Sequence, residues 1–327
     1  MSPKNVVVFV HGMTRDKKPS DPTAEFSDFW DALRDRGLDS FERSDAVFAG
    51  WGHEPEQVHV SLRPDQRICR AQAHISRLIN RAHVKRCAGP NNIVRRWPWN
   101  LDVVLGWTIG LREHTIQHGL TDVIYYCSAE GERAVRRTVY SQVLKHLDEF
   151  ADAGEVRLHL IAHSLGVTVA HDFLFGLFGQ YDEGYGPGFL REEQGDEHER
   201  ARFEQWRERA RNGTLTVGSI TSMASQLPLM IMRKQALVDR FFHDERLDPL
   251  SIGLRSDDKE GPCVKWNVIY DLDDVLGFAS RDIYHDPHGL IRQIQVKCGG
   301  VVRAHTGYLK NREVRRRTVE LINANMS

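Results

Sequence analysis

The sequence predicts an α/β fold in which a mostly parallel central sheet is flanked by helices. Short, unbroken runs of apolar and β-branched residues recur along the chain, as is typical of strands that are buried on both faces. Segments with apolar residues at helical spacing separate these runs, and a chain that alternates strand with helix favours a parallel sheet. The chain has 327 residues, of which 41% are hydrophobic, and this is enough for a sizeable core.

The chain begins with a predicted strand, a helix and a second strand. Residues 6–10, VVVFV, form an unbroken β-branched run that is typical of a buried strand. Residues 24–36 predict a helix because four large apolar side chains fall on one of its faces. Residues 45–51, DAVFAGW, predict the second short strand. The four side chains on the helix face are Phe26, Phe29, Trp30 and Leu33.

The remaining core elements follow the same alternation. The apolar pattern predicts helices over residues 130–150, 165–178 and 311–325, and strands over residues 156–162, 214–223, 264–270 and 292–302. Residues 122–128, DVIYYCS, fit a strand or the end of a helix equally well, because periodicity alone does not separate the two.

Two segments interrupt the pattern and predict insertions into one domain that spans residues 1–327. Residues 54–114 are expected to form a helical, cap-like insertion, since residues 61–96 hold nine Arg or Lys against one acid, with apolar residues at helical spacing. Its basic face is most simply solvated, although a basic amphipathic segment beside tryptophans also fits peripheral membrane contact through residues 61–111. Residues 182–211 are dense in charge and predict a second, partly helical insertion.

Composition bounds the partners and the compartment. The formal net charge is −1, so nothing global points to nucleic acid. The five cysteines contain no CxxC pair, which supports neither a disulfide framework nor a zinc site. We see no signal peptide and no apolar run of the roughly 18–20 residues that span a membrane, so a cytoplasmic protein is the expectation. The oligomeric state is left open.

One stretch, LHLIAHSLGV at residues 158–167, carries the chemistry. An apolar strand turns sharply into an apolar helix, and Ser164 stands at the turn. Bulky side chains two positions before and after this serine would collide, and Ala162 and Gly166 are small enough to avoid that. The turn also places the serine hydroxyl at the N-terminus of the helix, where the helix dipole favours negative charge.

The pattern AHSLG at residues 162–166 resembles the nucleophile elbow of the α/β-hydrolase fold, in its serine esterase and lipase branch, with alanine in place of the first glycine. The resemblance extends over the core strands from residue 6 to residue 308, but not over residues 54–114 or 182–211. It implies a Ser-His-Asp triad in the chain order serine, acid, histidine, and it implies neither a metal nor an organic cofactor.

The acid is expected just after the strand at residues 264–270, where three aspartates occur. Asp274 is the first choice, because in similar families the acid directly precedes proline or a small apolar residue and Asp274 precedes a valine. Asp271 and Asp273 stay open as alternatives, and turn-forming carboxylates would also explain them.

His305 is the expected base, since it lies in a small polar turn before the last helix, where similar esterases often carry histidine. His285 and His288 follow the acid too closely and precede the last strand, so they are weaker candidates. His163, beside the nucleophile, is expected to pack or to form hydrogen bonds rather than to catalyse.

The oxyanion hole needs two backbone N–H donors. The amide of Leu165 comes with the elbow. The resemblance implies that the second is the amide of Met13, after the first strand, with Gly12 letting the backbone approach and His11 in support. A turn after residue 223, ITSMASQLPL, also resembles one that lies beside the site in related esterases, with Ala224 where glycine is usual.

These residues together predict a serine hydrolase that cleaves a small-molecule carboxylic ester through an acyl-enzyme. The same triad would serve a thioesterase or an acyltransferase, and the sequence does not separate these activities. A non-catalytic binding or scaffold protein on the same fold is the alternative from another class.

Overall fold

The computed structural model describes residues 3–12, 22–50, 123, 126–179, 197–233, 235–243, 245–256, 264–274, 276–300 and 304–326. By its contacts the chain divides into two compact units, Met1–His53 with Ala129–Ser327, and Glu54–Ser128. The fold described below is that of the first unit. The predicted insertion at residues 54–114, with its basic segment at 61–111, and the predicted oxyanion residue Met13 lie outside the described residues.

In the described part of this unit the sheet has six strands, all parallel, in the order β2-β1-β3-β4-β5-β6. The predicted α/β fold with a mostly parallel central sheet is therefore confirmed. The strand order reverses between β1 and β3, and in open α/β sheets ligands bind at such a switch point, outside the carboxyl ends of the strands. The strands are β1 (Lys4–Val10), β2 (Ala46–Ala49), β3 (Val156–His163), β4 (Leu215–Met223), β5 (Trp266–Tyr270) and β6 (Ile291–Gln295).

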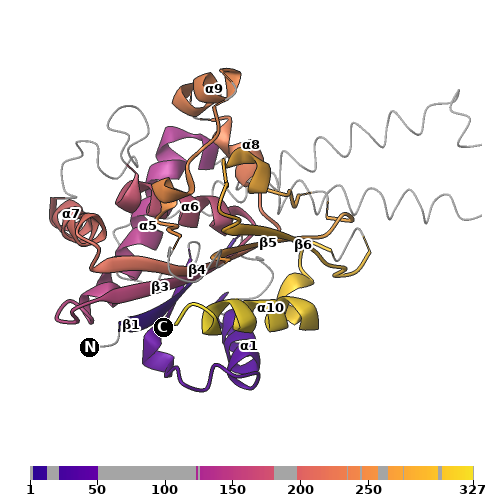
Figure 1. The fold of residues 1–327 in the computed structure, drawn as a ribbon, viewed down its shortest axis with the longest axis horizontal. Helices are drawn as coiled ribbons and strands as arrows, with labels where there is room; N and C mark the ends of the chain where they lie inside the picture. The colour runs from indigo at the N-terminus through magenta and orange to yellow at the C-terminus, as the bar shows by residue number, and fades with distance from the viewer. Residues whose placement is uncertain are drawn as a thin grey trace, which may run out of the picture. The chain divides into compact units, whose positions relative to one another are not determined.

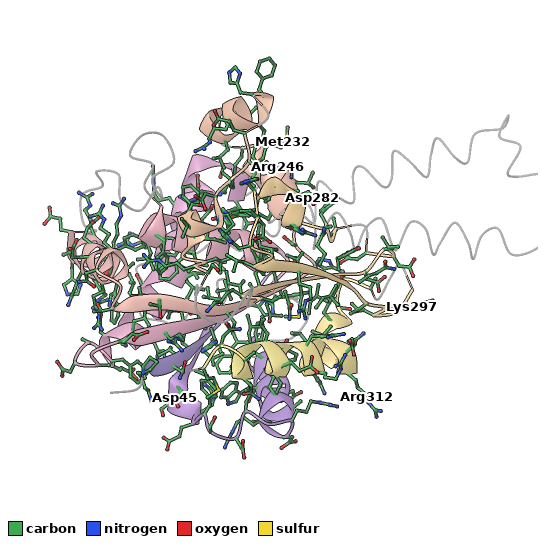
Figure 2. All side chains as sticks on the ribbon, viewed as in Figure 1. Asp45, Met232, Arg246, Asp282, Lys297 and Arg312 are labelled. Atoms are coloured by element: carbon green, nitrogen blue, oxygen red, sulfur yellow. The ribbon has the colours of Figure 1, made fainter. Side chains whose placement is uncertain are left out.

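Helices cover both faces of the sheet (Figure 1). On one face lie α1 (Pro22–Arg34) and α10 (Arg312–Asn323), and on the other lie α5 (Ala129–Asp148) and α6 (Leu165–Phe178). The remaining helices are α7 (Glu197–Arg211), α8 (Leu227–Ile231) and α9 (Gln235–Phe242), with short 3-10 turns at Arg43–Asp45, Pro249–Ile252, Arg281–Ile283 and Tyr308–Lys310. Figure 2 shows Met232, after α8, and Arg312, the first residue of α10, on opposite sides of the sheet.

The core lies between the sheet and these two layers. Residues 6–10 of β1 are buried throughout, as their unbroken apolar run predicts. The predicted apolar face of α1 packs beneath β1, where Phe9 meets Phe26, Phe29 and Trp30 with ring centroids 5.1 to 6.2 Å apart. Aromatic packing of this kind fixes the end of β1, from which His11 and Gly12 emerge.

The structure adds detail to the sequence-based expectation in three segments. The described part of the expected charged insertion is the helix α7, which buries Phe203, Trp206 and Ala210 against the neighbouring elements although most of its residues are charged. In the ambiguous stretch at residues 122–128, Val123, Tyr126 and Cys127 are helical. The last strand is shorter than predicted and ends at Gln295, before a bend at the Gly-Gly pair of residues 299–300.

No helix in the described part of the chain is long and apolar enough to cross a membrane.

Candidate active site

Ser164 is the single residue between the end of β3 and the start of α6. Its φ of 57° and ψ of −132° place it in a region that residues other than glycine rarely adopt. The strain is held by the neighbouring strand, because the amide of Ser164 donates to the carbonyl of Met223 in β4 at 2.9 Å. A rare backbone conformation that the surroundings enforce is typical of functional sites.

Two glycines let the chain pack this closely around Ser164. A Cβ on Gly166 would lie 2.5 Å from the carbonyl oxygens of Val10 and His11, so α6 can start against the end of β1 only if this residue is glycine. A Cβ on Gly12 would lie 2.7 Å from the Cβ of Ser164. Both positions are thus required by the approach of backbone to backbone.

The structure brings Ser164, His305 and Asp274 together from three separate segments. The Oγ of Ser164 lies 2.8 Å from Nε2 of His305, and Nδ1 of His305 lies 3.0 Å from both carboxylate oxygens of Asp274. Ser164 follows β3, Asp274 follows β5, and His305 comes from the turn before α10. All three therefore gather at the carboxyl edge of the sheet.

The proton positions in this chain follow from which atoms are able to donate. An ionised carboxylate only accepts, so Nδ1 of His305 carries the proton that it shares with Asp274. The Nε2 of the neutral ring is then an acceptor, and the hydroxyl of Ser164 donates to it. In this arrangement the ring is ready to take the proton of Ser164.

The carboxylate of Asp274 is held ionised. Burial alone would raise the pKa of Asp274, but the hydrogen bond from His305 and two further donors keep the pKa below its usual range. These donors are the amide of Leu276 at 3.0 Å and the hydroxyl of Tyr308 at 3.1 Å. Burial and the nearby carboxylate raise the pKa of Tyr308, so its hydroxyl stays protonated and keeps donating.

The other two candidate acids have different partners. The carboxylate of Asp271 accepts from the amides of Asp273 and Cys298, so it ties the end of β5 to the segment after β6. Asp273 is half-buried and lies between Asp271 and Asp274 in the sequence. The backbone amide of Asp271 donates to the hydroxyl of Tyr308 at 2.8 Å. Neither of these carboxylates has a hydrogen bond to His305 among the described contacts.

His163 supports the main chain of His305. Its Nε2 donates to the backbone carbonyl of His305 at 2.8 Å, because a carbonyl only accepts. Burial, helped by the neighbouring His305 and His11, lowers the pKa of His163 to about 3, so the ring is neutral. The expectation that His163 would form a hydrogen bond agrees with this contact.

The expected oxyanion donors are described in part. Leu165 is the first residue of α6, and the first four N–H groups of a helix have no partner within it. The register of β1 on β3 pairs Val10 with Ala162, so His11 and Gly12 run beside the elbow. The Nδ1 of His11 donates to the carbonyl of Gly12 at 2.8 Å.

The sequence did not single out Gln226, which also contacts Ser164. Its side-chain Nε2 lies 3.4 Å from the Oγ of Ser164, and the residue is 2% exposed. It belongs to the turn after β4, in which Ala224 has a φ of 53°, a conformation that favours glycine. The ASQLP stretch held the only available signal, because polar residues directly after a strand at the switch-point edge are candidates for a site.

The rival histidines lie elsewhere. His285 and His288 precede β6, so they are at the amino edge of the sheet, opposite to Ser164, and they line a hollow together with Arg246 and Arg255. Within the described ranges no group of His, Cys, Asp and Glu is arranged to hold a metal ion.

Neither the models of known protein families nor the curated proteins with which we compared the chain contain a match.

Proposed function

We propose that the protein is a serine hydrolase of the α/β-hydrolase type that cleaves carboxylic esters through an acyl-enzyme. The observation that carries the proposal is the continuous chain of hydrogen bonds from Ser164 through His305 to Asp274. A serine hydroxyl is a weak nucleophile, and it needs an adjacent base that a third group orients. The strained backbone of Ser164 at the switch point of the sheet adds independent support.

In the acylation half-reaction, the Oγ of Ser164 forms a bond to the ester carbonyl carbon while its proton passes to Nε2 of His305. The negative charge moves to the carbonyl oxygen, where the amide of Leu165 donates to it, and we assign the second donor to Met13. The bond between carbon and the leaving oxygen then breaks, and the alcohol leaves with the proton from His305. Asp274 stays ionised and stabilises the imidazolium.

Deacylation repeats these steps with water as the nucleophile. Water gives a proton to His305 as its oxygen attacks the acyl carbon. The bond between this carbon and Oγ breaks, and Ser164 regains the proton as the carboxylic acid leaves. An alcohol in place of water would make the protein an acyltransferase, so product partition with and without added alcohol separates these two activities.

A fluorophosphonate probe tests the proposal, because it bonds covalently to an activated serine. We expect the wild-type protein to be labelled and Ser164→Ala to remain unlabelled. Ser44→Ala, which removes an exposed hydroxyl, is the matched control and should be labelled like the wild type. A folded wild type that is not labelled, or labelling that persists in Ser164→Ala, would refute the proposal. A panel of esters with varied acyl length then defines the substrate.

A further inference from the structure

Gln226 contacts the proposed nucleophile but has no part in the mechanism above. It is the N-cap residue of α8 and reaches Ser164 from the turn that follows the adjacent strand β4. Both residues are almost completely buried, at 2% and 1% exposed. A buried carboxamide against a nucleophile has two polar atoms to satisfy, one donor and one acceptor.

The proton positions in the triad determine which of these atoms faces Ser164. The hydroxyl of Ser164 donates its proton to His305, so Oγ offers only lone pairs to any other partner. The atom of Gln226 that lies 3.4 Å away must therefore be the donor Nε2. The acceptor Oε1 is then the other polar atom of this carboxamide, bonded to the same carbon as Nε2.

The Oε1 atom of Gln226 is buried and has no hydrogen-bond partner in the part of the chain that the structure describes. A buried carbonyl oxygen that is left unpaired costs free energy, and such atoms in native proteins call for an explanation. A substrate whose carbonyl carbon becomes bonded to Oγ brings its adjacent atoms next to this amide. A donor on the substrate would then satisfy Oε1.

We infer that Gln226 selects the substrate: Oε1 accepts a hydrogen bond from an O–H or N–H that the substrate carries close to its scissile carbonyl. The inference rests on the proposed function. It names esters of 2-hydroxy acids, or monoesters of diols, as the substrate class, rather than simple alkyl esters. A site that is built to bond a substrate hydroxyl discriminates strongly against the analogue without it, because the protein group is then left unpaired.

Two matched pairs of esters test this inference. One pair places the donor on the acyl side, an aryl 2-hydroxypropanoate against the aryl propanoate. The other places it on the alcohol side, 2-hydroxyethyl butanoate against propyl butanoate. The measured quantity is the ratio of kcat/KM within each pair, in the wild type divided by the same ratio in Gln226→Met. Intrinsic reactivity of the esters cancels in this quotient.

We expect the quotient to be about 10-fold or more for at least one pair. Gln293→Met is the matched control, because Gln293 on β6 also has a buried, unpartnered Oε1 and lies outside the site. It should leave the ratios at the wild-type values. A quotient within twofold of 1 for both pairs would overturn the inference. An equally large quotient for Gln293→Met would overturn it too, as would a wild type that hydrolyses none of the four esters.

Gln226→Glu supplies a second variant, which carries the test if Gln226→Met does not fold. A carboxylate still accepts from the substrate, so the preference for the hydroxylated ester should remain. The loss of its donation to Ser164 affects both members of a pair alike, so it leaves their ratio of kcat/KM unchanged. Loss of the preference in this variant would contradict the inference. Labelling by fluorophosphonate separates the two proposals, since an unlabelled wild type refutes the hydrolase itself and a labelled one without preference refutes only the role of Gln226.

Discussion

The residues around Ser164 form hydrogen bonds whose direction the chemistry of each group fixes. The hydroxyl of Tyr308 accepts a hydrogen bond from the amide of Asp271 and donates one to Asp274. The carboxylate of Asp274 also accepts from the ring of His305. His163 holds the backbone of the same histidine. The orientation of His305 is thus fixed both through its ring and through its main chain.

Replacing Asp274 by Asn tests the assignment of the acid. The amide donates where the carboxylate accepts, so His305 would turn to the tautomer that cannot take the proton of Ser164. We expect kcat to fall by about 10⁴-fold with little change in KM. Asp273→Asn is the matched control, because the structure gives its carboxylate no contact with His305, and it should retain most of the activity. The rate of ester hydrolysis is measured for both variants. A loss of activity in Asp273→Asn but not in Asp274→Asn would contradict the assignment of Asp274.

The sequence locates some of these residues better than others. Ser164 could be predicted because an elbow is local, with a strand, a serine, small residues and a helix in ten positions. Asp274 was the first choice, but Asp271 and Asp273 stayed open, since three aspartates in one turn offer the same chemistry and only the folded turn directs one of them toward His305. Gln226 was missed because its contact depends on how the turns after β3 and β4 pack.

At the scale of the elements, the strand β3 carries a polar side chain through the centre of the sheet. His159 is fully buried, and its ring nitrogens lie 2.8 Å from Ser219 of β4 and 2.9 Å from Asn5 of β1. Burial, together with the nearby charges of Arg157 and Lys265, lowers the pKa of His159 to about 3. The neutral ring therefore links three adjacent strands, β1, β3 and β4.

This depressed pKa predicts how stability depends on pH. The unfolded chain binds a proton at His159 near pH 6.5 and the folded protein only near pH 3, so the free energy of unfolding is highest above 6.5 and decreases as the pH falls toward 3. Between pH 7 and pH 5 we expect the contribution of His159 to fall by about 2 kcal/mol. Urea unfolding at both pH values should show this loss in the wild type.

The variant His159→Gln keeps hydrogen-bonding capacity but does not titrate, so its stability should change by about 2 kcal/mol less over the same interval. His163, whose pKa is also about 3, remains in this variant and leaves a residual slope. His198→Gln, at an exposed side chain, is the control for loss of a histidine as such. An equal pH dependence in the wild type and in His159→Gln would contradict the prediction.

At the scale of the whole unit, a group of charged side chains joins the helices on the face of the sheet that carries α6. Asp172 of α6 accepts from Arg136 of α5 at 2.6 Å and from Arg233, which follows α8. Glu132 lies 2.6 Å from Arg136 and 3.5 Å from Arg233. The group therefore fixes the segment after α8 to α6, the helix that starts at Ser164.

The sequence could predict α5 and α6 as helices but not this connection between them. Arg136 and Asp172 stand among many charged residues whose pairing is visible only after the helices pack. Burial alone would raise the pKa of Asp172, yet Arg233 and Arg136 hold it well below its usual range. Its contribution to stability is thus complete above the ordinary aspartate pKa, near 3.9, and is lost only as the pH falls further.

Asp172→Asn should therefore destabilise the protein at neutral pH by about 3–5 kcal/mol, because it removes the buried carboxylate that Arg136 and Arg233 share. Urea unfolding measures this change. Glu313→Gln is the matched control, since it removes a carboxylate from an ion-pair group with Arg316 and Arg317 on the exposed side of α10, where solvent screens the charges. A loss in Asp172→Asn no larger than in this control would show that the buried charges do not hold α5, α6 and the segment after α8 together.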